Sequence, residues 1–185
     1  MSTRAELHDL IRRTLRELGA VEDVVANRML PVFADVRRLT AVGLGTDGRD
    51  KFLAPDAGRA WLSMRDAAAV DGIELLLVSA FRSFDFQLAL IRSKLAKGRT
   101  IEEILTVNAP PGCSEHHTGL AIDIGSAGTP PLEEDFETTA AFAWLSRRAA
   151  EFGYRLSYPR DNRHGYLYEP WHWCYHAHRA PRGTG

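Results

Sequence analysis

One short segment near the middle of the chain constrains the fold more than any other. Residues 119–125 read GLAIDIG. In an extended conformation, one face of this segment carries Leu120, Ile122 and Ile124, and the other carries Gly119, Ala121 and Asp123. The first face must be buried against a hydrophobic core. The second face presents a single carboxylate between residues too small to cover it, so we expect a sheet that leaves room for an ion beside Asp123.

The rest of the chain has the pattern of helices interrupted by a few short strands. Helices are expected over residues 3–18, 21–39 with a break at Pro31, 56–71, 84–97, 100–109 and 134–152, and a glycine-rich loop over 43–48. Further strands are expected over 73–80, 154–159 and 165–175. This order predicts an α+β fold, in which helices surround a small, mostly antiparallel sheet.

Length, charge and cysteine content limit the classes of protein to consider. The chain has 185 residues, a length at which one hydrophobic core is the default. Its 23 basic and 24 acidic side chains give a net charge of -1, so we expect no nucleic-acid partner. No apolar run approaches the roughly 18 residues that a membrane helix needs, so no membrane span is expected. Cys113 and Cys174 are expected to be buried residues rather than a disulfide.

Histidines gather in two places along the chain. His116 and His117 precede Asp123, while His164, His172, His176 and His178 lie toward the C-terminal end. Two imidazoles and one carboxylate are enough to hold zinc when water takes the fourth position. His116 and Asp123 are seven residues apart and would point to opposite faces of a straight strand. A turn at Thr118 and Gly119 would bring them together, and His172 would complete the set from the last strand.

The surroundings of His172 favour a catalytic site. Glu169 lies three residues before it, and a zinc hydrolase needs a nearby carboxylate as general base for the metal-bound water and as proton donor to the leaving amine. Trp171 and Trp173 flank His172 and are expected to pack in the core. The alternative is structural, with the same polar residues forming a capped turn and polar strand ends.

Other histidines compete for a place in this set. His117 follows His116 directly, but adjacent residues rarely point the same way, which favours His116. His176 and His178 continue the alternation of the last strand and would add donors to its face if the strand persisted. We expect the strand to end before them.

Three separated blocks give the chain a family resemblance. They are VSAFRSFDFQ, SEHHTGLAIDIG and GYLYEPWHWCY, with the strand FGYRLSYP before the last block. Over about residues 55 to 176, they resemble the VanY-type D-alanyl-D-alanine carboxypeptidases, zinc peptidases that trim peptidoglycan stem peptides. The resemblance implies the hedgehog/DD-peptidase fold and one bound zinc ion. We therefore expect an N-terminal helical segment, residues 1–50, packed on a single globular zinc peptidase domain, residues 51–185.

The resemblance also assigns a role to individual residues. It makes His116, Asp123 and His172 the zinc ligands and Glu169 the catalytic base. It places Arg82 in both the catalytic group and the substrate site, and Gln87 and Ser114 in the substrate site. The guanidinium of Arg82 can stabilise a polarised carbonyl or bind a substrate carboxylate. The alternatives are a surface ion pair for Arg82, a solvated helix position for Gln87 and a turn-forming hydroxyl for Ser114.

The expected function is zinc-dependent hydrolysis of D-alanyl bonds, D,D or L,D, in peptidoglycan stem peptides or muropeptides, by a monomer. Two alternatives stay open: a hedgehog-like domain that keeps zinc without hydrolysis, and an endolysin-type endopeptidase that cuts another bond of the stem peptide. Glu169 favours an enzyme, because a purely structural zinc site needs no base. The family suggests the cell envelope, whereas residues 1–19 lack the apolar core of a signal peptide, so the chain as written is not expected to be exported.

Overall fold

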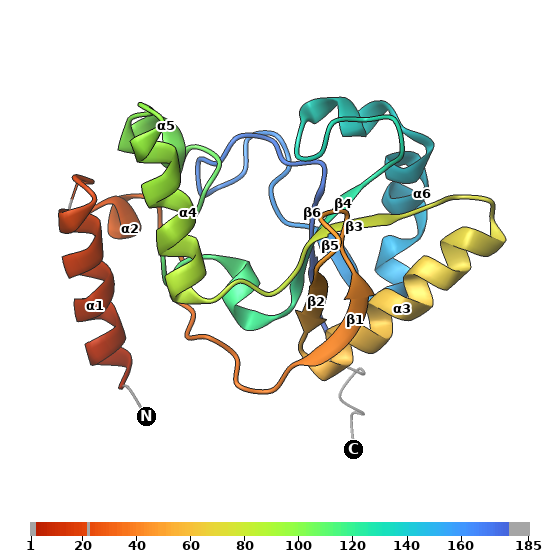
Figure 1. The fold of residues 1–185 in the computed structure, drawn as a ribbon, viewed down its shortest axis with the longest axis horizontal. Coiled ribbons are helices and arrows are strands. Elements are labelled where there is room, and N and C mark those ends of the chain that lie inside the picture. The colour runs from red at the N-terminus through yellow and green to blue at the C-terminus, as the bar shows by residue number, and fades with distance from the viewer. Residues whose placement is uncertain (1–2, 22, 178–185) are drawn as a thin grey trace, which may run out of the picture.

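A four-stranded antiparallel sheet forms the centre of the fold in the computed structural model, which describes residues 3–21 and 23–177 (Figure 1). Its strand order is β3-β4-β6-β5, with bounds Leu76–Ser79, Ala121–Gly125, His172–Tyr175 and Tyr154–Leu156 respectively. A separate antiparallel hairpin consists of β1 (Thr40–Leu44) and β2 (Asp50–Leu53). It is joined to the edge of the sheet by a 2.9 Å hydrogen bond from the Thr46 N–H to the Leu77 carbonyl. The α+β architecture expected from the sequence is confirmed.

The strand that carries Asp123 occupies an inner position in the sheet. All five residues of β4 are buried, between β3 and β6. Ile122 and Ile124 belong to the main hydrophobic core. Helices α3 (Pro55–Val70) and α6 (Ala140–Arg148) cover this core on one face of the sheet (Figure 1). Alternation along the strand then directs Asp123 to the opposite face, as the sequence predicts.

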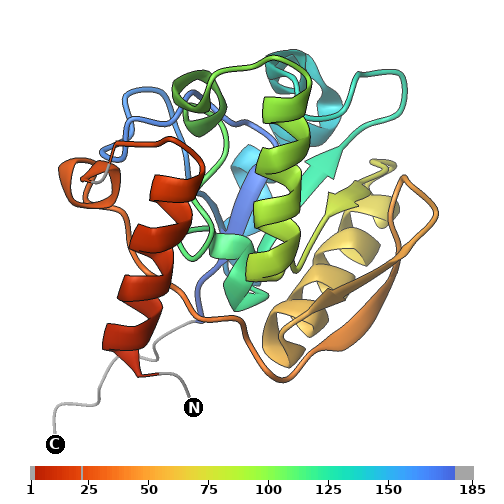
Figure 2. The ribbon, with the colours of Figure 1, turned by 60° about the vertical axis from the view of Figure 1, so that its left-hand side comes forward.

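A second group of helices lies away from that core. It comprises α1 (Arg4–Glu17), α2 (Val24–Asn27), α4 (Phe84–Ala96) and α5 (Ile101–Leu105). Figure 2 shows α1 running beside α4. Their buried side chains form a smaller hydrophobic cluster, made of Leu18, Ile91, Ile101, Ile104 and Leu105. Both capping boxes expected from the sequence are present, at Thr3 for α1 and at Thr100 for α5.

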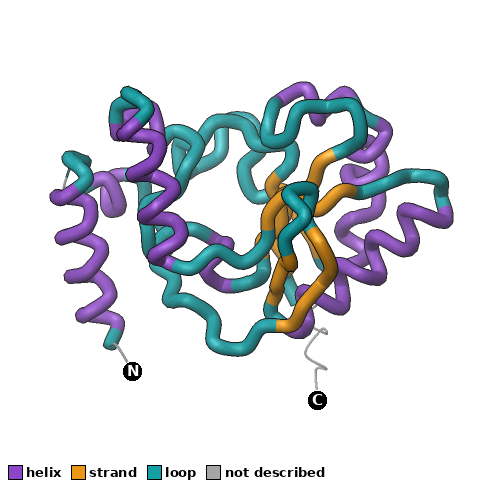
Figure 3. The backbone as a smooth tube through the Cα atoms, viewed as in Figure 1, coloured by secondary structure: helices purple, strands orange, loops and turns teal. Residues whose placement is uncertain are grey.

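Loops and short 3-10 turns connect these elements (Figure 3). The turns in the described part of the chain are η1 (Glu115–Thr118), η2 (Glu134–Thr138) and η3 (Ala149–Phe152). The helix expected over 134–152 is therefore divided. Thr139 is extended, and its hydroxyl accepts from the Phe142 N–H as the N-cap of α6. The strand expected over 165–175 is shorter than predicted. Pro170 has no N–H to donate, and the chain turns between Glu169 and His172 before β6 begins.

The segment between α1 and the hairpin differs most from expectation. The sequence predicts a helix over 21–39, but of the described residues in this range only those of α2 are α-helical, and residues 30–38 are irregular. Their N–H groups bond to the neighbouring loop instead: Phe33 donates to the Gly112 carbonyl and Val36 to the His117 carbonyl, each at 2.8 Å. Pro31 favours this course because it has no N–H for a helix. Residues 1–50 thus contain irregular chain and a strand as well as helices, and the division at residue 50 stays a prediction.

The two cysteines do not form a disulfide with each other. Cys113 and Cys174 are both buried as free thiols. Burial raises the pKa of the Cys113 thiol to about 12, so it stays neutral and packs as a small apolar group.

Within residues 3–21 and 23–177, every helix is too short or too polar to cross a lipid bilayer.

Candidate metal centre and active site

Strand pairing brings Asp123 and His172 together. The two residues are direct partners in the antiparallel register of β4 and β6, so their side chains stand on the same face of the sheet. The Nδ1 atom of His172 lies 3.0 Å from Oδ1 of Asp123, and both side chains are almost completely buried. The register of β4 and β6 therefore brings together two of the three expected ligands.

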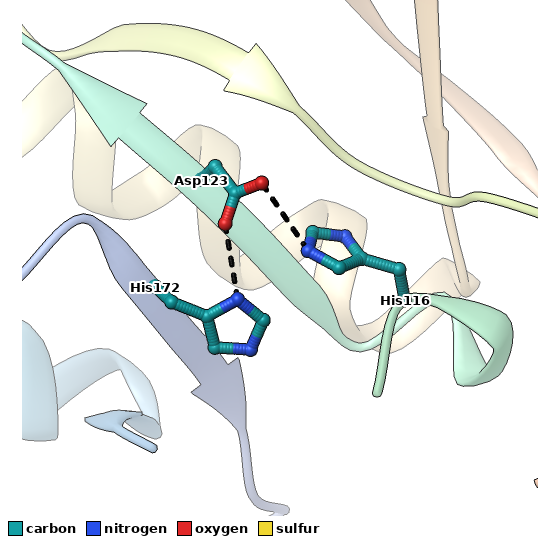
Figure 4. A group of neighbouring side chains, drawn as sticks. All are labelled: His116, Asp123 and His172. Carbon is teal, nitrogen blue, oxygen red and sulfur yellow. Dashed lines mark hydrogen bonds and ion pairs between the residues drawn. The ribbon is translucent and has the colours of Figure 1, made fainter. Parts of the chain in front are cut away.

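A tight turn brings His116 to the same place. The η1 turn ends at Gly119, which has a φ of 66°, a conformation that favours glycine. A Cβ at this position would lie 2.8 Å from the backbone nitrogen of Ala54, so there is also no space for a side chain. The turn reverses the chain between His116 and β4, and the Nε2 atom of His116 comes to lie 3.3 Å from Oδ2 of Asp123 (Figure 4).

The hydrogen bonds of His116 prepare it to bind a cation. Its Nδ1 donates to the Ala80 carbonyl at 2.6 Å, so the other ring nitrogen, Nε2, carries the free lone pair. Nε2 is buried and has no hydrogen-bond partner among the described residues. Burial, followed by the charge of Arg82, lowers the pKa of His116 to about 4, which keeps the ring neutral. A buried lone pair facing a carboxylate is unfavourable unless a cation lies between them.

The donor set suits zinc in number and type. One nitrogen or oxygen atom from each of His116, Asp123 and His172 lies within 4.8 Å of the other two, and all three residues are buried. Two imidazole nitrogens and one carboxylate leave a fourth position free in a tetrahedral site, as catalytic zinc sites require. The residues present therefore fit the metal that the sequence resemblance implies.

The competing histidines do not join this group. Both ring nitrogens of His117 are engaged: Nδ1 donates to the Arg82 carbonyl at 2.7 Å, and Nε2 accepts from the Gly112 N–H at 3.0 Å. His176 is exposed beyond the end of β6. His178 lies outside the described residues.

Glu115, which the sequence pattern did not single out, contacts the far side of His172. One oxygen of Glu115, Oε2, accepts from His172 Nε2 at 3.0 Å and from the Ser157 hydroxyl at 2.6 Å. Burial opposes a charge on His172, but the hydrogen bonds to Asp123 and Glu115 raise its pKa to about 10. Because an ionised carboxylate only accepts hydrogen bonds, both ring nitrogens of His172 carry a proton without a metal. A metal would replace the proton on Nδ1, while Glu115 holds the proton on Nε2. The sequence signal for Glu115 was its position directly before the ligand His116. Its contact with His172 could not be predicted, because the fold brings these two residues together.

Glu169 lies beside the donor group, where the sequence predicts a base. Its Oε2 atom is 3.9 Å from Nδ1 of His172, and its backbone N–H donates to the Tyr158 carbonyl at 3.1 Å. Burial raises the pKa of Glu169 to about 7, although the charge of His172 opposes this shift. A carboxyl group with a pKa near neutrality can both accept and return a proton at physiological pH.

Arg82 reaches the same group from the loop before α4. Its Nη2 atom lies 3.9 Å from Oδ2 of Asp123, and its Nε atom is buried without a hydrogen-bond partner in the described chain. The backbone of Arg82 is fixed on both sides, because its N–H donates to the His116 carbonyl at 3.3 Å and its carbonyl accepts from His117. The backbone that carries the guanidinium is therefore held in place, and the guanidinium itself has N–H groups free to donate.

Gln87 and Ser114 have structural contacts: Ser114 has the turn-forming role that was its alternative, whereas Gln87 is buried rather than solvated. Gln87 is buried in α4, where its side-chain nitrogen donates to the Ala109 carbonyl at 2.8 Å, and it lines neither cavity near the centre. Its Oε1 atom has no partner among the described residues. The hydroxyl of Ser114 caps the η1 turn by accepting from the His116 N–H. Substrate contacts by these two residues stay predictions.

Two cavities open onto the centre. The larger, of about 440 Å³, is lined by Asp123, Arg82 and Glu169 at one end, by the chain after α4, and by residues 131–134 and 167–171. The smaller, of about 20 Å³, is lined by His116, His172 and Ser114 together with Arg82 and Glu169. A ligand that enters the larger cavity therefore meets Asp123 and the potential base Glu169, whereas the two histidines line only the smaller cavity. Trp173 packs in the main core, as expected, and Trp171 both joins that core and lines the larger cavity.

Comparison with known proteins agrees with this arrangement. Residues 50–178 match the VanY family, whose description is D-alanyl-D-alanine carboxypeptidase. This chain belongs to the VanY family. The matched region contains all three residues of the donor group as well as Arg82 and Glu169. It begins at the end of the N-terminal segment. The sequence resemblance is thus confirmed at the level of the family.

Individual VanY relatives and structures extend the comparison. The chain is 36% identical over 137 residues to the putative carboxypeptidase YodJ of Bacillus subtilis (strain 168), covering 71% of this chain and 49% of YodJ. It thus spans about half the length of that relative. The LdcB LD-carboxypeptidase structure aligns with a TM-score of 0.68 and 32% identity, covering 78% of this chain and 71% of LdcB.

A zinc-bound structure shares the same fold. It is a variant of the vancomycin resistance D,D-pentapeptidase VanY from the VanB-type cassette, in complex with Zn(II). It aligns with a TM-score of 0.59 and 28% identity, covering 79% of this chain and 82% of that one. The α+β fold derived from the sequence is therefore the fold of the VanY and LdcB peptidases.

Proposed function

We propose that this protein is a zinc-dependent carboxypeptidase that hydrolyses D-alanyl bonds at the end of peptidoglycan stem peptides. The observation that carries the proposal is the buried group of His116, Asp123 and His172, with the raised-pKa carboxyl of Glu169 beside it. Membership of the VanY family supports the substrate class. The zinc complex of a VanY structure with the same fold supports the choice of metal.

Each residue of the site has a role in this proposal. His116 Nε2, His172 Nδ1 and a carboxylate oxygen of Asp123 hold the metal. When bound, zinc acidifies a water molecule toward neutral pH and polarises the carbonyl of the bond to be cleaved. Glu169 would accept a proton from the attacking water and would return a proton to the amine that leaves. Arg82 donates to the oxygen on which negative charge develops.

Glu115 has a supporting role in the proposal. Glu115 lines neither cavity, but its carboxylate accepts a hydrogen bond from the Nε2–H of His172. This keeps the ring in the orientation and tautomer in which Nδ1 is available to the metal. We therefore treat Glu115 as a positioning residue.

The stereochemistry of the bond is a finer question. LdcB, an LD-carboxypeptidase, aligns with a TM-score of 0.68, and the D,D-pentapeptidase VanY with 0.59. An L,D-carboxypeptidase is therefore the second candidate. Defined stem peptides distinguish the two: a D,D enzyme shortens a pentapeptide to a tetrapeptide, whereas an L,D enzyme shortens a tetrapeptide to a tripeptide. Mass spectrometry of the products identifies the bond.

The central test is Glu169→Gln in the zinc-loaded protein. The substitution keeps size and shape but removes the base, so zinc content should be unchanged while turnover falls about 10²–10⁴-fold. Glu102→Gln, at an exposed position on α5, is the matched control and should cleave stem peptides at the wild-type rate. If the wild-type protein with stoichiometric zinc cleaved neither peptide, a non-catalytic, hedgehog-like zinc domain would replace this proposal.

A further inference from the structure

The larger cavity contains positive charges that the proposed mechanism does not use. Lys94, near the end of α4, and Arg99, just after that helix, line the cavity together with Asn108. These three residues form one wall, and the reacting groups Asp123 and Glu169 lie in the same cavity. A ligand that fills the cavity therefore meets both sets of residues.

Lys94 is held in this wall by a neutral partner. Its Nζ donates to Oδ1 of Asn108 at 3.0 Å. Asn108 is itself buried, and its side-chain nitrogen donates to the Ile104 carbonyl at 3.1 Å, which fixes its oxygen toward Lys94. Among the described residues, neither Lys94 nor Arg99 forms an ion pair with a carboxylate. Lys94 is thus held in a positively charged wall in which it has a neutral hydrogen-bond partner and no ion pair.

The charges around Lys94 strengthen this conclusion. Burial, followed by the charges of Arg99 and Arg82, lowers the pKa of Lys94. These shifts mean that the ammonium group is partly desolvated and is repelled by two other cations in the cavity. An anionic ligand group would relieve both costs.

Two further acidic residues of the cavity lie in a different segment from Lys94 and Arg99. Glu133 and Glu134 belong to the chain at 131–134, and Glu134 is 3.4 Å from Arg160, with which it pairs. The same segment adds the apolar side chain of Leu132, and Leu167 lines the cavity as well. A peptide in the cavity would therefore have positive groups along one wall and acidic or apolar groups elsewhere.

We propose that Lys94, supported by Asn108 and Arg99, binds a carboxylate of the peptide substrate that is not part of the bond being cleaved. The inference rests on the proposed function and adds a requirement for the substrate, namely a free carboxylate that reaches this wall. A lysine and an arginine side by side provide the charge and the hydrogen-bond donors for such a group. Two sources have this chemistry: the C-terminal carboxylate of the peptide and a side-chain carboxylate of a residue before the cleaved bond.

The test uses matched peptides that end in D-alanyl-D-alanine or in L-residue–D-alanine, according to the bond that the wild type cleaves. One peptide carries glutamate before the bond, a second carries glutamine there, and a third has a C-terminal carboxamide. Values of kcat/KM are measured for wild type, Lys94→Met and Lys94→Arg. Lys97→Met is the control, because Lys97 is exposed at the end of the same helix and does not line the cavity.

Lys94→Met should lower kcat/KM about tenfold or more for peptides with the recognised carboxylate, through KM, and should leave the matching carboxamide peptide unchanged. The pair that shows this selectivity identifies the source of the carboxylate. Lys94→Arg should keep most of the preference, and Lys97→Met should behave as wild type. An equal loss for all peptides, or no loss for any, would overturn the proposal.

Failure of the proposed function gives a different result. If the zinc-loaded wild type cleaves none of the peptides, their binding to it is measured by titration calorimetry. A preference for carboxylate over carboxamide that disappears in Lys94→Met then supports the subsite without hydrolysis. Equal affinities in both proteins would overturn it.

Discussion

At the scale of single residues, the site depends on which nitrogen of each histidine is free. The Nδ1–H of His116 donates a hydrogen bond to the Ala80 carbonyl, and the Nε2–H of His172 donates one to Glu115. The remaining nitrogens, Nε2 and Nδ1, are the ones that face Asp123. Two hydrogen bonds outside the ligand group thus determine its geometry.

Removal of the Glu115 carboxylate should therefore weaken zinc binding. We expect Glu115→Ala to raise the dissociation constant for zinc about 10–100-fold, the usual effect of losing such a partner. Glu115→Gln should have a smaller effect, because its amide oxygen can still accept the Nε2–H of His172. Competition with a chromophoric chelator measures all three proteins. Ser157→Ala is the matched control: it removes the other hydrogen bond of Glu115 but leaves the contact with His172. Wild-type zinc affinity in Glu115→Ala would contradict the positioning role.

At the scale of elements, local sequence signals predicted some parts well and others poorly. The strand at β4 and the caps at Thr3 and Thr100 are local features, because alternation and capping boxes need only neighbouring residues. The hairpin of β1 and β2 was missed, since its glycine-rich sequence also fits a loop. The predicted helix over 21–39 was wrong because its backbone groups find partners in the loop before η1, a contact that sequence periodicity does not reveal.

The N-terminal segment supports the active-site loops although it precedes the family match. Both oxygens of Asp35 accept from the Phe84 N–H, at 3.0 and 3.1 Å, at the start of α4. Oδ1 of Asp35 is also 3.4 Å from Nδ1 of His117, which binds the Arg82 carbonyl. From the same segment, Arg28 donates to the carbonyls of Leu105 and His164. The segment thus links α4, the η1 region and the loop before β6.

Loss of the Asp35 carboxylate should affect both stability and catalysis. Asp35→Ala should lower the free energy of unfolding by about 1 kcal/mol, as for other residues that satisfy N–H groups at a helix start. It should also lower kcat, because the backbone at Arg82 loses a support. Urea unfolding and peptide hydrolysis measure the two effects. Asp9→Ala, which removes an exposed ion pair with Arg12 on α1, should change neither. If both variants behaved alike, the segment would have no such role.

At the scale of the whole molecule, the site joins segments that are far apart in the sequence. Arg82, the η1 turn, β4 and the turn before β6 meet only because β3, β4 and β6 are neighbours in one sheet. The types of the donor residues and their spacing pointed to a metal group, and the structure brings these donors together. Glu115 and Lys94 could not be found in this way. Their roles depend on partners 57 and 14 residues away, respectively, whose proximity is set by the fold.

The burial of the Glu169 carboxyl should also make the stability of the metal-free protein depend on pH. The pKa of Glu169 is raised from 4.5 to about 7 in the folded state, chiefly by burial. Between these values the folded protein holds the proton more tightly than the unfolded chain does. Its contribution to stability is therefore fully present below pH 4.5 and is lost as the pH rises through 7. At pH 8 the ionised Glu169 should cost roughly 3 kcal/mol.

Glu169→Gln cannot ionise, so it should avoid this cost. In metal-free protein at pH 8, we expect its free energy of unfolding to exceed that of the wild type by more than it does at pH 5, with the difference growing by roughly 1–3 kcal/mol. Urea unfolding at the two pH values, with chelator present, measures the change, and Glu102→Gln should show none. Groups elsewhere in the molecule titrate in both proteins and cancel in the comparison. The difference in unfolding free energy between Glu169→Gln and wild type could instead stay constant from pH 5 to 8. Glu169 would then not hold its proton near neutrality, and it could not be the single carboxyl that accepts and returns the proton.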